Sequence, residues 1–569
     1  MLTESCIASI TSEEYSNYII EKNIFTDSYL ASDPNICSQS LGPAFIAVYV
    51  PTSSRVPLSL NNTPYATIPK LFGIMDTTAV NAVNSQQLSN LSTLGLKGQG
   101  TIVGFIDTGI DYTHSAFKTS TGQTRITCIW DQTIPSTSPN SLSSAAYGTL
   151  FSRSQINTAI NSTSPYMYVP SRDTNGHGTF LAGVCAGSEN KEDDFTGIAS
   201  ESEIAVVKLK EAKNYLREYF LVPQDALCYQ EDDIMSGINF LVEYASLVSK
   251  PLVICIGLGT SQGSHTGNSP LISLINSYSL KTGIAICIAT GNEGDSRKHF
   301  EGMVSPNEDY QNVELRVSNA NKGFSLEMWG EAPDIFSIGI LSPSGEFLER
   351  IPARLGQTET YNFIFDNTTI TIDYSLVENY SGRELILIRF FTPTEGIWTI
   401  RVFSKNTLNG KYNIWLPISA FLNENTYFLT PDPDTTLTSP SDGIYAMSVA
   451  AYNHYNNSLY LSSGRGFSAI GAIRPDFAAP GVNVFGPALN NSYTRKSGTS
   501  ISAAITAGVA AQFMTWGIEQ QNAPTLNGLS IKNYLIRGAK REASITYPNK
   551  NTGYGLLDAF NSFDILRND

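Results

Sequence analysis

Positive charge is scarce in this chain and nowhere forms a cluster. Of its 569 residues, 36 are lysine or arginine and 51 are aspartate or glutamate, so the formal net charge at pH 7 is −15. Nucleic acids and anionic membranes attract clustered basic side chains, so neither is expected as a partner. The length and an apolar fraction of 41% are ample for a large core and more than one domain.

Cysteine is also scarce, and its spacing shows no pairs. The number is odd, and several cysteines lie in apolar runs that predict core strands. We expect all seven to be reduced and buried, which favours a cytosolic or spore-interior origin. The N-terminus lacks the basic start and the apolar stretch of a signal peptide, so we expect a cytoplasmic or spore-associated protein. The cysteines are Cys6, Cys37, Cys128, Cys185, Cys228, Cys255 and Cys287.

Only one apolar run, Ile501–Ile518, approaches the length of a membrane span. Its alanine, glycine, serine and threonine side chains are too small and too polar for that role. We therefore predict a buried core helix there and no membrane span.

Three short segments carry the chemistry of the chain. The first is an apolar run that ends in an acid, the second holds a histidine between glycines, and the third places a serine before a run of small residues. In chain order they are Ile102–Gly109, Asn175–Thr179 and Ser497–Ser500. The order acid, histidine, serine indicates a nucleophilic triad and differs from the orders found in chymotrypsin and the α/β-hydrolases.

The residue types predict the role of each group. A serine hydroxyl is a poor nucleophile until a neutral imidazole takes its proton, and a buried carboxylate must orient that imidazole. We therefore predict Ser500 as nucleophile, His177 as base and then acid, and Asp107 as orienter. Asp111 is a competing acid, but it lies beyond the turn that follows Asp107.

The predicted local structure supports these roles. The run before Asp107 is predicted to be a buried strand whose carboxyl end holds the acid, where open α/β sheets place their sites. Helices are predicted after the histidine, over Phe180–Val184 with Asn175 as a cap, and after the serine, over Ile501–Val509. A nucleophile at a helix N-terminus gains from the positive end of the helix dipole.

Asn292 adds a fourth group to the set. It follows the strand-like run Ile286–Ala289 and a Thr-Gly turn. Its side-chain amide can donate to the oxyanion of a tetrahedral intermediate. The alternative is that Asn292 only makes a turn, as most Gly-Asn dipeptides do. Because the three other segments are present, we predict the oxyanion role.

Together these motifs resemble those of the subtilisin-like serine proteases, and the resemblance covers nearly the whole chain outside one insert. Further stretches are similar to the clostridial germination proteases, the Csp-like subtilases. They are Thr124–Ile126, Ile129–Gln132, Val207–Lys210, Gly257–His265, Gly464–Phe467 and Arg474–Val482. The resemblance implies an α/β fold with a subtilisin-like doubly wound parallel sheet and a serine endopeptidase that needs no cofactor.

The resemblance also implies a substrate-binding surface, along which an extended peptide pairs as an added strand. Subtilases usually have serine where this chain has Gly257, which leaves the preference of the adjacent pocket open. The acidic triplet Glu192–Asp194 indicates a solvated turn, so no metal is predicted. The predicted substrate-binding residues are Gly257, Leu258, Gly259, Thr290 and Gly291.

Subtilases carry a small N-terminal α+β prodomain that acts as folding template and inhibitor, with its tail in the active site. By resemblance, residues 1–80 fill this role, with the junction between Phe72 and Gln87 and one self-cleavage near residue 80. Within this part we predict a helix over Thr11–Glu21 and a strand over Ala44–Val50. The alternative is an ordinary N-terminal subdomain that is never cleaved.

The rest of the chain divides into three parts. Residues 81–303 alternate strand-like and helical runs, which predicts the first part of a doubly wound catalytic domain. Short strands separated by turns predict an inserted β-sandwich over residues 304–419, similar to the jelly roll of the germination proteases. Residues 420–569 complete the catalytic domain. We expect the insert to stabilise the fold, with a substrate-docking surface as the alternative.

Two other functions are alternatives to the protease. A subtilase fold can serve as a catalytically silent sensor or scaffold, but all four residues that carry the chemistry are present. The glycines of Gly98–Gly100 suggest dinucleotide binding as an alternative function, but they precede their strand instead of following it. We predict a self-cleaving serine endopeptidase whose partners are a protein or peptide substrate and its own prodomain. The activation of a spore cortex hydrolase during germination is implied by the resemblance alone.

Overall fold

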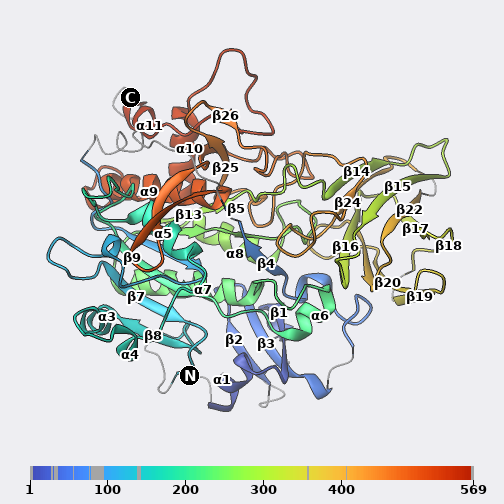
Figure 1. Cartoon of the computed structure of the whole chain (residues 1–569), viewed down its shortest axis with the longest axis horizontal. Helices are drawn as coiled ribbons and strands as arrows, with labels where there is room; N and C mark the ends of the chain where they lie inside the picture. The colour runs from blue at the N-terminus through green and yellow to red at the C-terminus, as the bar shows by residue number, and fades with distance from the viewer. Residues whose placement is uncertain are drawn as a thin grey trace.

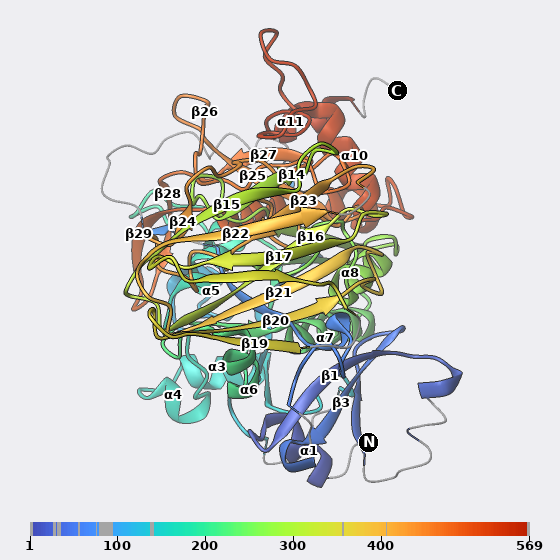
Figure 2. The same cartoon turned by 90° about the vertical axis from the view of Figure 1, so that its right-hand side faces the viewer.

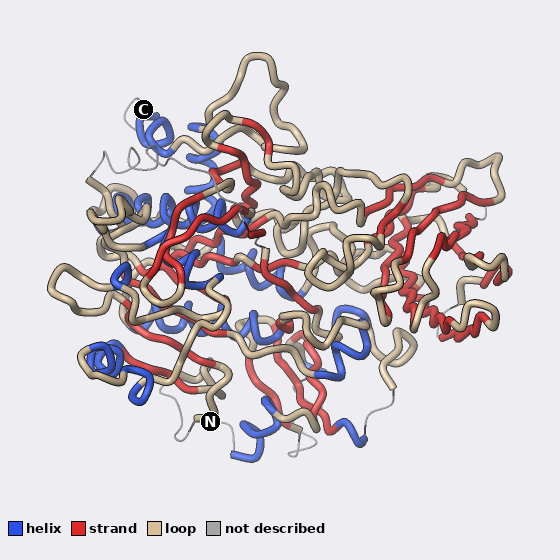
Figure 3. The backbone as a smooth tube through the Cα atoms, in the orientation of Figure 1, coloured by secondary structure: helices blue, strands red, loops and turns tan. Residues whose placement is uncertain are grey.

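An α/β body lies beside an all-β lobe, and a small N-terminal unit packs against the body (Figures 1 and 2). The tube view in Figure 3 separates the helix-rich body from the lobe, which consists of strands and loops. The structure is a computed structural model that describes residues 4–26, 30, 36–54, 57–75, 77–78, 95–136, 142–354, 358–404 and 407–565.

The body is built on a nine-stranded sheet. Its strands are β6 Ile102–Asp107, β7 Ile126–Asp131, β8 Thr149–Ser152, β9 Glu203–Lys208, β11 Leu252–Ile256, β13 Ile284–Ala289, β25 Met447–Asn453, β26 Ser458–Leu459 and β27 Phe477–Pro480. The strands β25, β13, β11, β6, β9 and β7 are parallel neighbours, and β27 pairs parallel with β25. Most of these strands are fully buried, as a sheet covered on both faces requires.

Helices cover both faces of this sheet. One apolar core joins the sheet to α5 His177–Ala186, α9 Thr499–Met514 and α10 Gly528–Gly538. A second core on the other face holds α7 Glu231–Leu247 and α8 Pro270–Ser279. The predicted doubly wound α/β arrangement is therefore confirmed, as are the helices predicted after His177 and Ser500.

The helical stretch Thr499–Glu519 is long and apolar enough to cross a membrane, but 89% of its most apolar window is buried inside the protein. It is a core helix, as the small side chains of this run predict. The helices that lie in the connections of the body are α3 Arg153–Ile160, α4 Pro165–Tyr168, α6 Asn214–Phe220 and α11 Ala559–Asp564.

The N-terminal unit is a helix on a three-stranded antiparallel sheet. Its elements are α1 Glu4–Thr11, β1 Tyr15–Glu21, β2 Cys37–Ser40 and β3 Phe45–Pro51, with sheet order β1-β3-β2. The predicted strand at β3 is confirmed. The predicted helix over Thr11–Glu21 is wrong, because every residue from Tyr15 to Glu21 pairs with β3. Strand pairing across the unit overrides the local helix signal.

The prediction that all seven cysteines are reduced is wrong for one pair. Cys6 of α1 and Cys37 of β2 form a disulfide bond, with their Cα atoms 5.2 Å apart. The packing of α1 on the sheet brings together two cysteines that lie 31 positions apart in the chain. The other five cysteines are free and buried.

The all-β lobe is a sandwich of two antiparallel sheets around one apolar core. One sheet holds β14 His299–Met303, β16 Gly323–Gly330, β19 Thr358–Phe363, β20 Thr368–Ser375, β21 Glu384–Phe391 and β23 Lys411–Trp415. The other holds β15 Tyr310–Val317, β17 Phe336–Leu341, β18 Phe347–Ile351, β22 Gly396–Ser404 and β24 Tyr427–Phe428. The lobe extends beyond the predicted limits 304–419, because β14 pairs with β23 and β24 pairs with β15.

The close packing of α7 on β6 leads to a stability prediction. A Cβ atom on Gly104 of β6 would lie 2.7 Å from Leu241 Cδ1, so the helix sits directly on the strand that ends at Asp107. Leu241 is fully buried, whereas Leu247 on the same helix is 67% exposed. We expect Leu241→Ala to lower the free energy of unfolding by about 2–5 kcal/mol and Leu247→Ala to change it by less than about 0.5 kcal/mol, measured by urea unfolding. Equal effects of the two substitutions would contradict this packing.

Candidate active site

Asp107, His177 and Ser500 come together at one end of the sheet. Asp107 ends β6, His177 begins α5, and Ser500 is the second residue of α9. His177 Nδ1 lies 2.7 Å from Asp107 Oδ1 and 2.9 Å from Oδ2, and His177 Nε2 lies 3.1 Å from Ser500 Oγ. All three side chains are buried. A hydroxyl, an imidazole and a carboxylate in this line can pass a proton from the serine to the histidine.

The competing acid Asp111 lies apart from this line. Its Oδ1 accepts hydrogen bonds from Thr113, and its Oδ2 accepts one from the backbone N–H of Asn490. The predicted cap of α5 is shifted by one residue, because Gly176 occupies the capping position with φ of +87°. The side chain of Asn175 still accepts a hydrogen bond from the N–H of His177, at 3.2 Å.

Asp173 is a buried carboxylate that the sequence analysis missed. Its Oδ1 accepts hydrogen bonds from Thr108 Oγ1 at 2.9 Å, from Asn175 N at 3.0 Å and from Gly176 N at 2.8 Å. Its Oδ2 accepts two more, from the N–H and the hydroxyl of Thr179. Asp173 thereby joins the turn after the orienting acid to the start of the histidine helix. Its place four residues before the histidine was the only signal in the sequence.

Asn292 is held with its amide nitrogen free. Its Oδ1 accepts hydrogen bonds from Thr499 N at 3.1 Å and from Thr499 Oγ1 at 3.2 Å. The same threonine hydroxyl accepts a hydrogen bond from Gly291 N. The Nδ2 of Asn292 is buried and has no hydrogen-bond partner among the described residues. A buried donor without a partner, beside the nucleophile, is the arrangement that an oxyanion hole requires.

The predicted substrate-binding surface holds a segment of the same chain. Strand β4, Leu71–Ile74, lies between β10, Tyr229–Gln230, and β12, Leu258–Gly259, and pairs antiparallel with both. In this register, Ile74 faces Leu258 and Gly73 faces Gly259. The two outer strands pair with the backbone of this segment, as protein surfaces do when they bind extended peptides.

Met75 presents its carbonyl group to the serine. Its N–H donates to the carbonyl oxygen of Gly257 at 3.1 Å. Its carbonyl oxygen accepts a hydrogen bond from Ser500 Oγ at 2.7 Å and from Ser500 N at 3.4 Å. Beyond it, β5 Thr77–Thr78 pairs with β29 Ser492–Ser497, whose other neighbour is β28 Val484–Ala488. The chain therefore runs through the site on both sides of Met75.

The predicted cleavage position near residue 80 lies outside the described residues, which omit 76 and 79–94. Within the N-terminal part of the chain, Met75 makes a hydrogen bond to Ser500. This position falls within the predicted window from Phe72 to Gln87.

Two glycines near the site, Gly259 and Gly291, leave no room for a side chain. A Cβ atom on Gly259 would lie 3.3 Å from Met75 Cε and would overlap the hydroxyl of Thr438. A Cβ atom on Gly291 would lie 2.5 Å from Thr438 Cγ2. Thr290 and Thr438 are both buried, and their hydroxyls have no hydrogen-bond partner among the described residues. Thr438 is a further residue beside these glycines that the motifs did not indicate, because it comes from the chain that returns from the β-sandwich.

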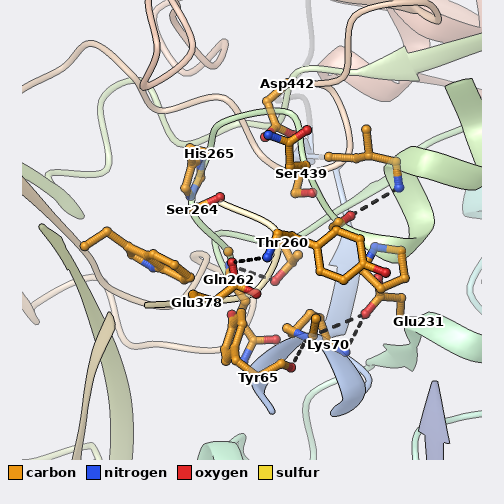
Figure 4. Close-up of a pocket in the computed structure, with 18 of the residues that line it drawn as sticks. Tyr65, Lys70, Glu231, Thr260, Gln262, Ser264, His265, Glu378, Ser439 and Asp442 are labelled. Carbon is orange, nitrogen blue, oxygen red and sulfur yellow. Dashed lines mark hydrogen bonds and ion pairs between the residues drawn. The ribbon is translucent and has the colours of Figure 1, made fainter. Parts of the chain in front are cut away.

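A polar junction fixes the entry of β4 into the cleft (Figure 4). The ammonium group of Lys70 is buried, donates to the backbone oxygens of Tyr65 and Ile68, and lies 3.8 Å from Glu231 Oε2. Burial lowers the pKa of Lys70, while the nearby carboxylates oppose that shift. The N–H of Leu71 donates to Gln262 Oε1 at 2.8 Å. These contacts set the register of the strand that follows.

The acidic triplet Glu192–Asp194 lies exposed on a turn. Within the described ranges, no group of three or more histidine, cysteine, aspartate or glutamate side chains is placed to hold a metal ion.

Comparison with protein families gives one match over most of the chain. The model of the Subtilase family matches residues 98–345 and 409–555. The matched residues include Asp107, His177, Asn292 and Ser500. The part left out between them lies within the β-sandwich.

Individual relatives and one solved structure are also similar. The PII-type proteinase of Lactococcus lactis subsp. cremoris is 22% identical over 88% of this chain, and the chain spans only 27% of its length. The major intracellular serine protease of Bacillus subtilis is 28% identical over 28% of the chain and 46% of its own length. The structure of the Clostridium perfringens CspB protease is 32% identical, with a TM-score of 0.74, over 84% of this chain and 97% of that one.

The contacts of Asp173 lead to a prediction on local order. In Asp173→Asn, the amide group cannot accept all five hydrogen bonds, so the start of α5 should loosen. We expect hydrogen exchange at the amides of Gly176 and Thr179 to rise about tenfold or more, measured by mass spectrometry after deuterium labelling. Asp193→Asn, in an exposed turn, is the control and should leave these amides unchanged. Unchanged exchange in Asp173→Asn would show that the carboxylate does not hold this segment.

Proposed function

The chain belongs to the subtilase family, and from that premise we propose that it is a serine endopeptidase that first cuts its own chain after Met75. The observation that carries this proposal is the hydrogen bond of 2.7 Å between Ser500 Oγ and the carbonyl oxygen of Met75. The carbonyl group is held at the serine, and the hydroxyl turns its proton from the Met75 oxygen to His177 Nε2, 3.1 Å away, before Oγ attacks the carbonyl carbon.

We propose the following steps. Ser500 Oγ attacks the carbonyl carbon of Met75 while His177 Nε2 takes the hydroxyl proton, and Asp107 stabilises the imidazolium that forms. The Asn292 amide and the Ser500 N–H donate to the oxyanion. His177 then returns the proton to the amine of Asp76 as the peptide bond breaks. Water hydrolyses the acyl-enzyme and leaves Met75 with a free carboxylate. The same site then serves other peptide substrates.

In this proposal the N-terminal unit is a prodomain, and polar contacts keep it bound after the cut. Lys213 of the body is buried, and its ammonium group donates to Ser9 O, to Tyr15 O and to Asn17 Oδ1. Asn17 Nδ2 in turn donates to Asp232 Oδ2 at 2.7 Å. Breaking the chain at Met75 removes none of these contacts between the unit and the body.

Two finer roles stay predictions. Activation of a spore cortex hydrolase during germination draws support from the likeness to the CspB protease, and a cytoplasmic or spore-associated location goes with it. The alternative of a catalytically silent scaffold is less favoured, because a silent site has no need of a free, buried donor at Asn292.

The first test of the proposed function is self-cleavage. We expect the refolded wild-type chain to separate into two fragments, the larger beginning at Asp76, as read by intact mass and N-terminal sequencing. Ser500→Ala should stay whole. The matched control is Ser502→Ala, two residues along α9, whose hydroxyl donates to the backbone oxygens of Ala479 and Pro480. This variant should still cut. A whole wild-type chain, or a cut in Ser500→Ala, would refute the proposal.

The second test addresses the oxyanion donor. Asn292→Ala removes one donor from the developing negative charge, so we expect self-cleavage to slow by about 10²–10³-fold. The time course of fragment formation after refolding measures this rate. Asn312→Ala, on the exposed face of the β-sandwich, controls for the loss of an asparagine side chain. If Asn292→Ala slowed self-cleavage by less than about fivefold, far below the factor expected for an oxyanion donor, Asn292 would have no part in the mechanism.

A further inference from the structure

Gly73 lies two residues before Met75 and is the third residue before the proposed cut. It is buried and pairs with Gly259. Its φ is not in the left-handed region, so the backbone here is open to any residue. In an extended strand a glycine is unfavourable unless a close neighbour needs the space.

The neighbour is the segment that connects β23 to β24 of the β-sandwich. A Cβ atom on Gly73 would lie 2.7 Å from Ile418 Cδ1, 3.2 Å from Ala420 Cβ and 3.4 Å from Phe421 Cε1. Ile418 and Phe421 are 1% and 5% exposed and belong to the same apolar core as Leu71. We call residues 418–421 the cover segment.

The cover segment is tied to the body next to the catalytic groups. The N–H and hydroxyl of Ser419 donate to the two carboxylate oxygens of Glu293, at 2.9 Å and 2.8 Å. Glu293 directly follows the proposed oxyanion donor in the chain. Lys298 Nζ donates to Ser419 Oγ at 3.0 Å and to Leu422 O at 3.1 Å. Because these hydrogen bonds hold the chain directly after Ile418, at Ser419 and Leu422, the segment cannot move away freely from the strand beneath it.

We infer that the cover segment selects glycine at the third residue before the cut, in the chain's own processing and in peptide or protein substrates. This inference rests on the proposed function and gives the β-sandwich a part in substrate choice. A Cβ atom at this position forces the packed side chains of Ile418 and Ala420 to give way, and crowding of this kind is unfavourable.

Self-cleavage of the full chain tests the inference. Gly73→Val keeps an extended backbone favourable while adding three carbon atoms, and we expect it to slow the cut by about 100-fold or more; Gly73→Ala should slow it by about tenfold. The double variant Gly73→Val/Ile418→Ala removes the nearest obstacle. It should cut itself at least about tenfold faster than Gly73→Val alone. The matched control is Gly73→Val/Ile397→Ala, which truncates an isoleucine that is 47% exposed on β22. This variant should cut itself at the same rate as Gly73→Val alone.

Each outcome decides the matter. A Gly73→Val chain that cuts within about threefold of wild type would overturn the inference, and so would equal rates for the two double variants. Recovery specific to Ile418→Ala shows that Gly73→Val folds and that the cover segment is the obstacle. If the wild-type chain itself stays whole, the proposed function fails. If it is cut but valine is tolerated, only the glycine selection fails.

Discussion

The antiparallel pairing of Gly73 and Ile74 with Gly259 and Leu258 determines which carbonyl group of the chain lies against Ser500. A slip of one residue would turn every side chain of the segment over and move the carbonyl of Met75 away from the serine. The polar junction upstream and the cover segment above both act on this register. The N-terminal unit, the body and the β-sandwich therefore meet at one strand, and each contributes to what that strand presents to the nucleophile.

The residues of the proposed mechanism could be picked out from the sequence because each lies in a local pattern. Asp107 ends an apolar strand, His177 and Ser500 open helices of small residues, and Asn292 follows a strand and a glycine. Such patterns depend on neighbours in the chain. Asp173 adopts its role through contacts on both sides of a turn, and only its place four residues before the histidine sets it apart from other aspartates. The parallel sheet with helices on both faces followed from the alternation of strands and helices, whereas the order of the strands did not.

The parts that could not be predicted depend on contacts between distant residues. Tyr15–Glu21 has a helix-capping signal nearby, yet pairing with β3 makes it a strand. Cys6 and Cys37 meet only because a helix packs on a sheet. The place of Met75 depends on strand register, which the alternation of side chains does not specify for a short segment with glycine in it. The contact of Ile418 with Gly73 joins residues more than three hundred positions apart, which no local pattern contains.

The occupation of the cleft by the chain's own segment is tested most directly by the concentration dependence of self-cleavage after refolding. If Met75 lies against Ser500 of the same molecule, the first-order rate constant should stay the same across a wide range of protein concentrations, since the reacting groups are already in contact. Wild-type protein added to Ser500→Ala should then leave it whole. A rate constant that rises in proportion to concentration, or efficient cutting of Ser500→Ala by added wild type, would contradict that arrangement.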